Sequence, residues 1–190
     1  MNSASKGNTQ LVEALRDFFA ADNALAMEKA YLALDRENFL PLPTVREWNK
    51  AEFSFNRLFT GPQALEAPPY ASVYLQPEPL LMAETTMTVR KVYESMGLAS
   101  CWKNTVPDDH ISIELDAARI LLQLKHQPDR EESDELRKFF VQEHMGTWIP
   151  AFCSRVENSG HAHEAIVGVC RILAIWLKQQ IREIQDVSGN

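Results

Sequence analysis

Two aspartates and a histidine stand together at a predicted helix start, as Asp108, Asp109 and His110. Glu114 follows His110 by four residues, so the imidazole and this carboxylate share one face of the helix. An aspartate before a helix commonly accepts N–H bonds from its first turn, which stabilises by about 1 kcal/mol, and His110 then pairs with Glu114 or faces solvent. A carboxylate also accepts two parallel N–H bonds from a guanidinium. The group therefore either caps the helix or holds an arginine of a partner.

Catalytic chemistry finds little support elsewhere in the sequence. It contains no nucleophile elbow, no phosphate-binding loop and no His-Glu-x-x-His zinc motif. His110 and Glu114 are too few to hold a metal ion, and His161 and His163 would point to different sides of a helix. We therefore expect no metal and no cofactor. A small helical hydrolase using His110 with Asp109 or Glu114 is the least favoured alternative.

A second group of candidate residues lies about forty residues earlier, in a connection interrupted by prolines. This connection covers residues 61–79, and its centre, residues 70–75, alternates weakly between polar and apolar. We interpret it as an extended loop that packs on the body of the protein. Its aromatic side chains either anchor the loop or form the hot spots of a peptide-binding surface. The candidates here are Tyr70, Ser72, Tyr74 and Leu75.

Composition excludes several classes of protein. The chain has 190 residues, 45% hydrophobic and 24% charged, which suits one soluble globular domain. Its net charge of −7 argues against a nucleic-acid binder and favours basic partners. The N-terminus has no apolar signal region, and no apolar run is long enough to span a membrane. The scattered cysteines Cys101, Cys153 and Cys170 form no C-x-x-C pair and suit a reducing cytoplasm.

Apolar residues recur at helical spacing through most of the chain, which predicts an all-α bundle of seven or so helices with one long proline-rich loop in the N-terminal half. We expect a single domain over 1–190, with an N-terminal half at 9–98, a hinge at 99–107 and a C-terminal half at 108–185. Residues 1–8 and 186–190 are expected to fray, and a break is expected around Gly146 and Pro150. The predicted helices cover approximately residues 9–19, 22–34, 45–59, 80–96, 108–127, 129–140 and 163–184.

Four segments, in order, resemble motifs of the TorD/DmsD/NarJ family of redox enzyme maturation chaperones, with the DmsD-like branch nearest. The segment at 52–62, E-F-S-F-N-R-L-F-T-G-P, is similar to the family's E-Y-x-x-L-F signature. The segment at 68–75, P-P-Y-A-S-V-Y-L, is similar to a proline–aromatic–glycine–serine–valine stretch. Residues 107–122 resemble P-D-H-x-x-x-E-L-x-F-M-x-x-L, and residues 140–152 resemble H-L-x-x-W-x-x-x-F. The chain departs from the third motif at Asp108, an additional acid, and at residues 116–118, where Asp-Ala-Ala replaces Glu-Phe-Met.

The resemblance implies a cytoplasmic all-α chaperone without catalytic turnover. Such a chaperone binds the twin-arginine signal peptide of a molybdopterin oxidoreductase, of the DMSO or TMAO reductase type, and delays its Tat export until the cofactor is inserted. A NarJ-like chaperone for a subunit that is not exported is the alternative, and either a monomer or a domain-swapped dimer is compatible with the family. Asp109 and His110 match the family's Asp-His, Tyr70 matches an aromatic residue of its proposed peptide pocket, and Gly97 matches a nearby glycine.

This resemblance suggests how a peptide would be held. A twin-arginine peptide carries a basic pair followed by an apolar stretch. We expect an acidic rim at Asp108 and Asp109 to pair with the arginines, while a groove lined by Tyr70, Leu75 and nearby methionines buries the stretch. Burial at about 25 cal/mol per Å² would supply most of the attraction, and exposed ion pairs would add about 0–1 kcal/mol each.

Overall fold

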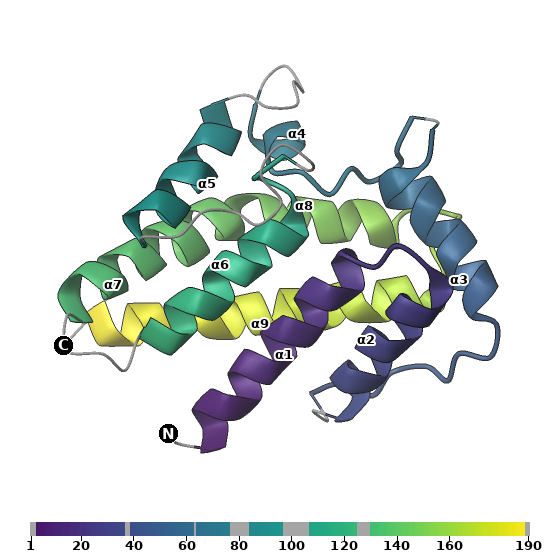
Figure 1. Ribbon diagram of the computed structural model, residues 1–190, viewed down its shortest axis with the longest axis horizontal. Helices are drawn as coiled ribbons and strands as arrows, with labels where there is room; N and C mark the ends of the chain where they lie inside the picture. Colours follow the sequence, from purple (N-terminus) through teal and green to yellow (C-terminus); the bar gives the residue numbers. More distant parts are fainter. Residues whose placement is uncertain are drawn as a thin grey trace.

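The computed structural model describes residues 3–36, 39–62, 64–76, 84–96, 107–124 and 130–188 (Figure 1). Over these residues the chain is helical and forms no strand, which confirms the predicted all-α fold. None of the helices in these ranges combines the length and apolarity needed to cross a membrane. The elements are α1 (Ser3–Phe19), α2 (Ala24–Arg36), α3 (Trp48–Phe55), η1 (Asn56–Thr60, a π-helical segment), α4 (Ser72–Leu75), α5 (Glu84–Ser95), α6 (Ile111–Leu124), α7 (Arg130–Arg137), η2 (Lys138–Met145, also π-helical), α8 (Gly146–Glu157) and α9 (Glu164–Ser188).

The core forms where α1 packs on α6 and α2, and where α8 packs alongside α9. Figure 1 shows α9, in yellow, running along the length of the molecule. Its apolar residues recur at spacings of three and four, so one face stays buried from Ala165 to Ile184. Trp176 on that face donates Nε1–H to Asn8 Oδ1 at 2.8 Å, which links α9 to the beginning of α1.

The helix ends differ from the predicted ones in places. Residues 3–8 and 186–188 are helical rather than frayed. The predicted start of the second helix near Asp22 is close to the observed one, because the Asn23 side chain accepts the Ala26 N–H at 2.9 Å and so caps α2. The third helix stops at Gly61 as expected. A Cβ at that position would lie 2.7 Å from the Asn56 carbonyl oxygen, so glycine suits this turn.

The predicted break around Gly146 and Pro150 is wrong. α7, η2 and α8 follow one another without an interruption, and Pro150 lies inside α8. A proline removes one helix hydrogen bond, but tertiary burial outweighs that loss. The core buries side chains on both sides of the η2–α8 junction, namely Met145, Trp148 and Ile149, and their packing keeps the helix continuous.

The prediction of an extended loop at residues 70–75 is also wrong, because Ser72–Leu75 form the short helix α4. The Ala71 carbonyl accepts N–H bonds from Tyr74 and Leu75, each at 3.0 Å. One helical turn is too short to show a period in the sequence, so the weak alternation was misleading. The ring of Tyr74 stacks on Trp148, with centroids 5.6 Å apart, and this contact fixes α4 on α8. The predicted hinge, except Pro107, lies outside the described residues.

Candidate peptide-binding site

Tyr70 and His110 are far apart in the sequence but pair directly in the fold. They form an isolated antiparallel bridge. On either side of it, Ala71 N–H donates to the Asp109 carbonyl at 3.0 Å, and Ile111 N–H donates to the Pro69 carbonyl at 2.9 Å. The two rings lie with centroids 5.1 Å apart in an edge-on arrangement. The proline-rich connection and the start of α6 therefore act as one structural unit.

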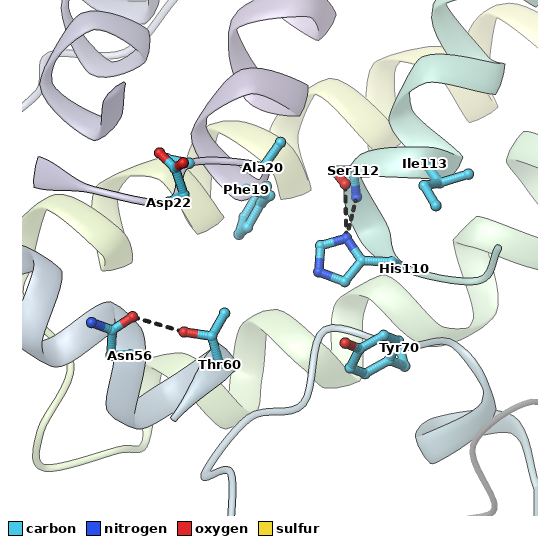
Figure 2. A pocket seen from close by; sticks show the side chains of 10 residues that line it. Phe19, Ala20, Asp22, Asn56, Thr60, Tyr70, His110, Ser112 and Ile113 are labelled. Atoms are coloured by element: carbon cyan, nitrogen blue, oxygen red, sulfur yellow. Dashed lines mark hydrogen bonds between the residues drawn. The ribbon is translucent and has the colours of Figure 1, made fainter. Parts of the chain in front are cut away.

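This unit forms one side of a cavity of about 330 Å³. The volume is at the small end of the range for ligand pockets, so the cavity can hold one or two side chains but not a whole peptide. Figure 2 shows His110 and Tyr70 on one side, Asp22 and Asn56 on the other, and Phe19 between them. The described lining residues come from the end of α1, the α1–α2 turn, η1, the proline-rich connection and the start of α6: Phe19, Ala20, Ala21, Asp22, Asn56, Thr60, Tyr70, His110, Ser112 and Ile113.

His110 presents a neutral hydrogen-bond donor to this cavity. Its Nδ1 atom accepts the Ser112 backbone N–H at 3.2 Å and lies 2.8 Å from Ser112 Oγ. A backbone amide can only donate, so Nδ1 carries no proton and Nε2 carries it. Burial lowers the pKa of the His110 imidazole from 6.5 to about 4, although the neighbouring Asp109 acts in the opposite direction. Figure 2 shows Nε2 on the side of the ring away from Ser112, where it faces the cavity. It has no hydrogen-bond partner within the described part of the chain.

The two aspartates next to His110 are buried and already engaged. Asp109 Oδ2 accepts the Ser72 N–H at 2.9 Å, so this carboxylate holds the beginning of α4. Asp108 Oδ2 accepts from Arg90 Nε at 2.6 Å, and only 3% of the Asp108 side chain is exposed. Neither residue lines the cavity. In this structure both carboxylates join neighbouring segments, and neither forms an acidic rim.

Glu114 pairs with a residue other than the expected one. Although it follows His110 by four residues, its Oε1 lies 2.6 Å from His144 Nε2, and its Oε2 accepts Trp148 Nε1–H at 2.9 Å. Burial raises the pKa of the Glu114 carboxyl, against the opposing effect of His144. Burial alone would lower the pKa of His144, but the Glu114 carboxylate outweighs it and the net direction is upward. The pair therefore holds its shared proton tightly and fixes α6 against η2 and α8.

The candidate residues thus divide into three groups. Tyr70 and His110 line the cavity, while Ser72, Asp108, Asp109 and Glu114 are buried behind it. Tyr74 and Leu75 are half-buried on α4 and pack against the core, and Gly97 lies outside the described residues. The binding role assigned to this set remains a prediction.

Sequence reasoning missed the opposite wall of the cavity. Asn56 and Thr60 belong to the 52–62 segment that carries the first family motif, and Thr60 Oγ1 donates to Asn56 Oδ1 at 2.7 Å. That motif was a usable signal for them. Asp22 and the end of α1 gave no such signal, because only tertiary packing brings them to the cavity.

The described residues contain no candidate metal-binding site. Within the ranges that the structure describes, no three His, Cys, Asp or Glu side chains gather closely enough to hold a metal ion. Cys153 and Cys170 are free and buried, and Cys153 Sγ lies 3.4 Å from the Cys170 carbonyl oxygen. Both cysteines therefore occupy positions that suit small buried apolar residues.

We expect the His110 imidazole to remain neutral from pH 5.5 to 8, with its proton on Nε2. Its ¹⁵N and ¹³C chemical shifts should stay constant over this range, and His110→Gln identifies the signals. Because the folded-state pKa is lowered, the neutral ring stabilises the fold above pH 6.5, and this contribution is lost as the pH falls from 6.5 to about 4. A titration midpoint close to 6.5 would contradict the buried, neutral assignment.

Comparison with known proteins identifies the family. The family model described as nitrate reductase delta subunit matches residues 2–154, which is most of the chain. The chain belongs to this family. It is the family that the four sequence segments resemble, and it includes chaperones of the TorD and DmsD types.

Curated relatives are similar at modest identity. The Tat proofreading chaperone DmsD of Salmonella typhi is 28% identical over 160 residues, covering 80% of this chain and 74% of that protein. A probable Tat proofreading chaperone DmsD of Haemophilus influenzae is 29% identical over 125 residues, covering 64% of this chain and 58% of that protein. The chaperone protein TorD of Aliivibrio salmonicida is 31% identical over 113 residues, covering 56% and 53%. The matched stretch thus spans little more than half of the last two relatives.

Proposed function

We propose that this protein is a cytoplasmic chaperone that binds the twin-arginine signal peptide of a molybdopterin oxidoreductase and delays Tat export until the cofactor is inserted. The relatives are named as chaperones and not as enzymes, so we infer binding without turnover. We place the binding surface at the cavity beside Tyr70 and His110.

One observation carries this placement. The bridge between Tyr70 and His110 joins two motifs of the family and sets both rings at the edge of the same cavity. An aromatic ring, a buried donor and apolar walls are typical of a site that anchors a peptide by a few side chains. Burial raises the pKa of the Tyr70 hydroxyl, and the charge of Asp109 adds to this effect, so the hydroxyl stays protonated at neutral pH.

The proposal is tested by titrating a synthetic twin-arginine signal peptide into the protein in a calorimeter. We expect binding by the unaltered chain and about tenfold weaker binding by Tyr70→Ala, since buried aromatic anchors dominate such interfaces. Phe139→Ala is the matched control, because Phe139 is an aromatic residue of η2 with 41% of its surface exposed and lies away from the cavity.

The outcomes separate site from function. If Tyr70→Ala and the unaltered chain bind the peptide with equal affinity, the binding site does not lie at this cavity. Absence of binding by the unaltered chain would reject the signal peptide as the ligand. Circular dichroism of each variant checks that a loss of binding does not reflect a loss of fold.

The alternative is an assembly chaperone for an oxidoreductase subunit that is not exported, and the family model is described as nitrate reductase delta subunit. Co-purification from the native host distinguishes the two functions. A client with a twin-arginine leader supports the first, and a client without a leader supports the second. A hydrolase finds no support in the named relatives.

A further inference from the structure

One exposed carboxylate lines the side of the cavity opposite His110, and two exposed apolar side chains lie on the neighbouring helices α2 and α3. We call these three residues, Asp22, Leu25 and Phe53, the α2 rim. Asp22 lines the cavity and is exposed. Leu25 and Phe53 are 75% and 73% exposed, the highest values among the large hydrophobic residues that the structure describes.

The three residues belong to one junction of the fold. The Glu52 carboxylate accepts the Ala24 N–H at 3.0 Å, which fixes the start of α2 against α3. Leu25 follows Ala24 and Phe53 follows Glu52, so the two exposed side chains lie on the helices that this hydrogen bond joins. Phe53 is three residues before Asn56, a cavity-lining residue, so the two lie on the same side of the helix. Contiguous exposed apolar side chains rimmed by polar residues are typical of interaction surfaces.

Charge and polarity indicate what this surface binds. Asp22 is the one carboxylate among the described residues that line the cavity, and Figure 2 shows it across from His110 with its oxygens turned away from the imidazole. Its Oδ1 accepts a hydrogen bond from Asn23 Nδ2 at 2.6 Å, and Asn23 is neutral. Among the described residues, no cationic side chain contacts this carboxylate. By contrast, the Asp108 carboxylate already forms an ion pair with Arg90.

The His110 side of the cavity suits the backbone and apolar side chains of a ligand rather than a basic side chain. His110 is only 7% exposed, and its Nε2–H has no partner in the described residues. A neutral N–H donor cannot accept a hydrogen bond from a guanidinium, but it can donate to a backbone carbonyl. The apolar walls beside it, Phe19 and Ile113, suit an apolar side chain.

We propose that the α2 rim binds a basic side chain of the client peptide at Asp22, while the cavity takes a neighbouring apolar side chain and His110 Nε2–H holds its backbone carbonyl. Leu25 and Phe53 cover the apolar residues that remain outside the cavity. This inference rests on the proposed function and assigns the arginine contact to Asp22, in place of Asp108 and Asp109.

A double-mutant cycle between protein and peptide tests the charge contact. We expect Asp22→Asn to weaken binding of a twin-arginine peptide about fivefold, the scale of one partly exposed ion pair. The same substitution should leave unchanged the affinity for a peptide in which the contacting arginine is glutamine, so each arginine is replaced in turn. Asp35→Asn is the matched control, because Asp35 is also exposed but lies near the other end of α2.

The apolar part of the α2 rim has its own test. Phe53→Ser should weaken binding of both peptides about equally, whereas Val187→Ser, at an exposed site of α9, should have no effect. If the unaltered chain binds and Tyr70→Ala does not, while Asp22→Asn and Phe53→Ser bind normally, the α2 rim is overturned and the proposed function stands. If the unaltered chain binds no peptide, both are overturned.

Discussion

Replacing His144 with alanine is expected to lower the free energy of unfolding by about 3–5 kcal/mol, because the substitution leaves the buried Glu114 carboxylate without its partner. The Trp148 indole would remain as a donor to that carboxylate. Urea denaturation followed by circular dichroism measures the loss. The size of the effect follows from burial, since the Glu114 carboxylate is fully buried away from water.

A second substitution isolates the cause of this loss. Glu114→Gln in the His144→Ala background removes the uncompensated charge and should recover about 1–3 kcal/mol, the cost of an unsatisfied buried group. Glu114→Gln alone keeps a similar shape and should cost less than His144→Ala. An equal loss in both His144→Ala proteins would mean that packing, and not the buried charge, sets the stability.

The same pair predicts a pH dependence. The pKa of both partners is raised in the folded state, so the folded chain binds more protons than the unfolded one. Stability must then fall as the pH rises above 6.5, the ordinary value for histidine, through the raised pKa of His144. Unfolding curves at pH 6, 7 and 8 should show this decline in the unaltered chain. The decline should flatten in Glu114→Gln, and a parallel decline in that variant would contradict the assignment.

Phe152→Ala is expected to be as damaging, at about 3–5 kcal/mol, because it opens a hole in the aromatic cluster beneath the site. Phe152 is fully buried, and its ring lies 5.8 Å from that of Phe19, 5.6 Å from that of Phe59 and 6.2 Å from that of Tyr74. One side chain thus links α1, η1 and α4 to α8. Phe19 also lines the cavity, so peptide affinity should fall together with stability.

Two measurements separate these effects of Phe152→Ala. Thermal unfolding gives the stability, and peptide titration well below the unfolding transition gives the affinity. Phe152→Leu keeps most of the volume and should cost about 1–2 kcal/mol with little loss of binding. A fully stable Phe152→Ala protein would show that the cluster relaxes to fill the space.

The sequence was a good guide wherever burial repeats along one element. α9 was predicted because Ile166, Val169, Cys170 and Leu173 recur on one face, and all are buried. The two motifs were expected at one groove, and Tyr70 does lie against His110. Both inferences depend on local patterns or on motif order, which a single chain displays.

Contacts between distant residues were not predictable in the same way. Glu114 seemed to belong with His110 by helical spacing, yet the fold turns it toward His144, thirty residues further on. Asp108 and Asp109 were expected at the surface, but both are buried. Asp108 accepts a hydrogen bond from Arg90, and Asp109 accepts one from the Ser72 amide. Asp22 carries no motif, and its place at the cavity depends on how α1 and α2 meet the other helices.

The neutral imidazole of His110 bears on how a client leaves. Above about pH 5 this ring takes up no proton, because its pKa is close to 4 and ordinary cellular pH lies well above that value. Acidification or alkalinisation within a living cell therefore cannot loosen a carbonyl held at Nε2. Under the proposed function, a client would then leave by competition, either from the export machinery for the same residues or from the maturing client, which withdraws its own leader.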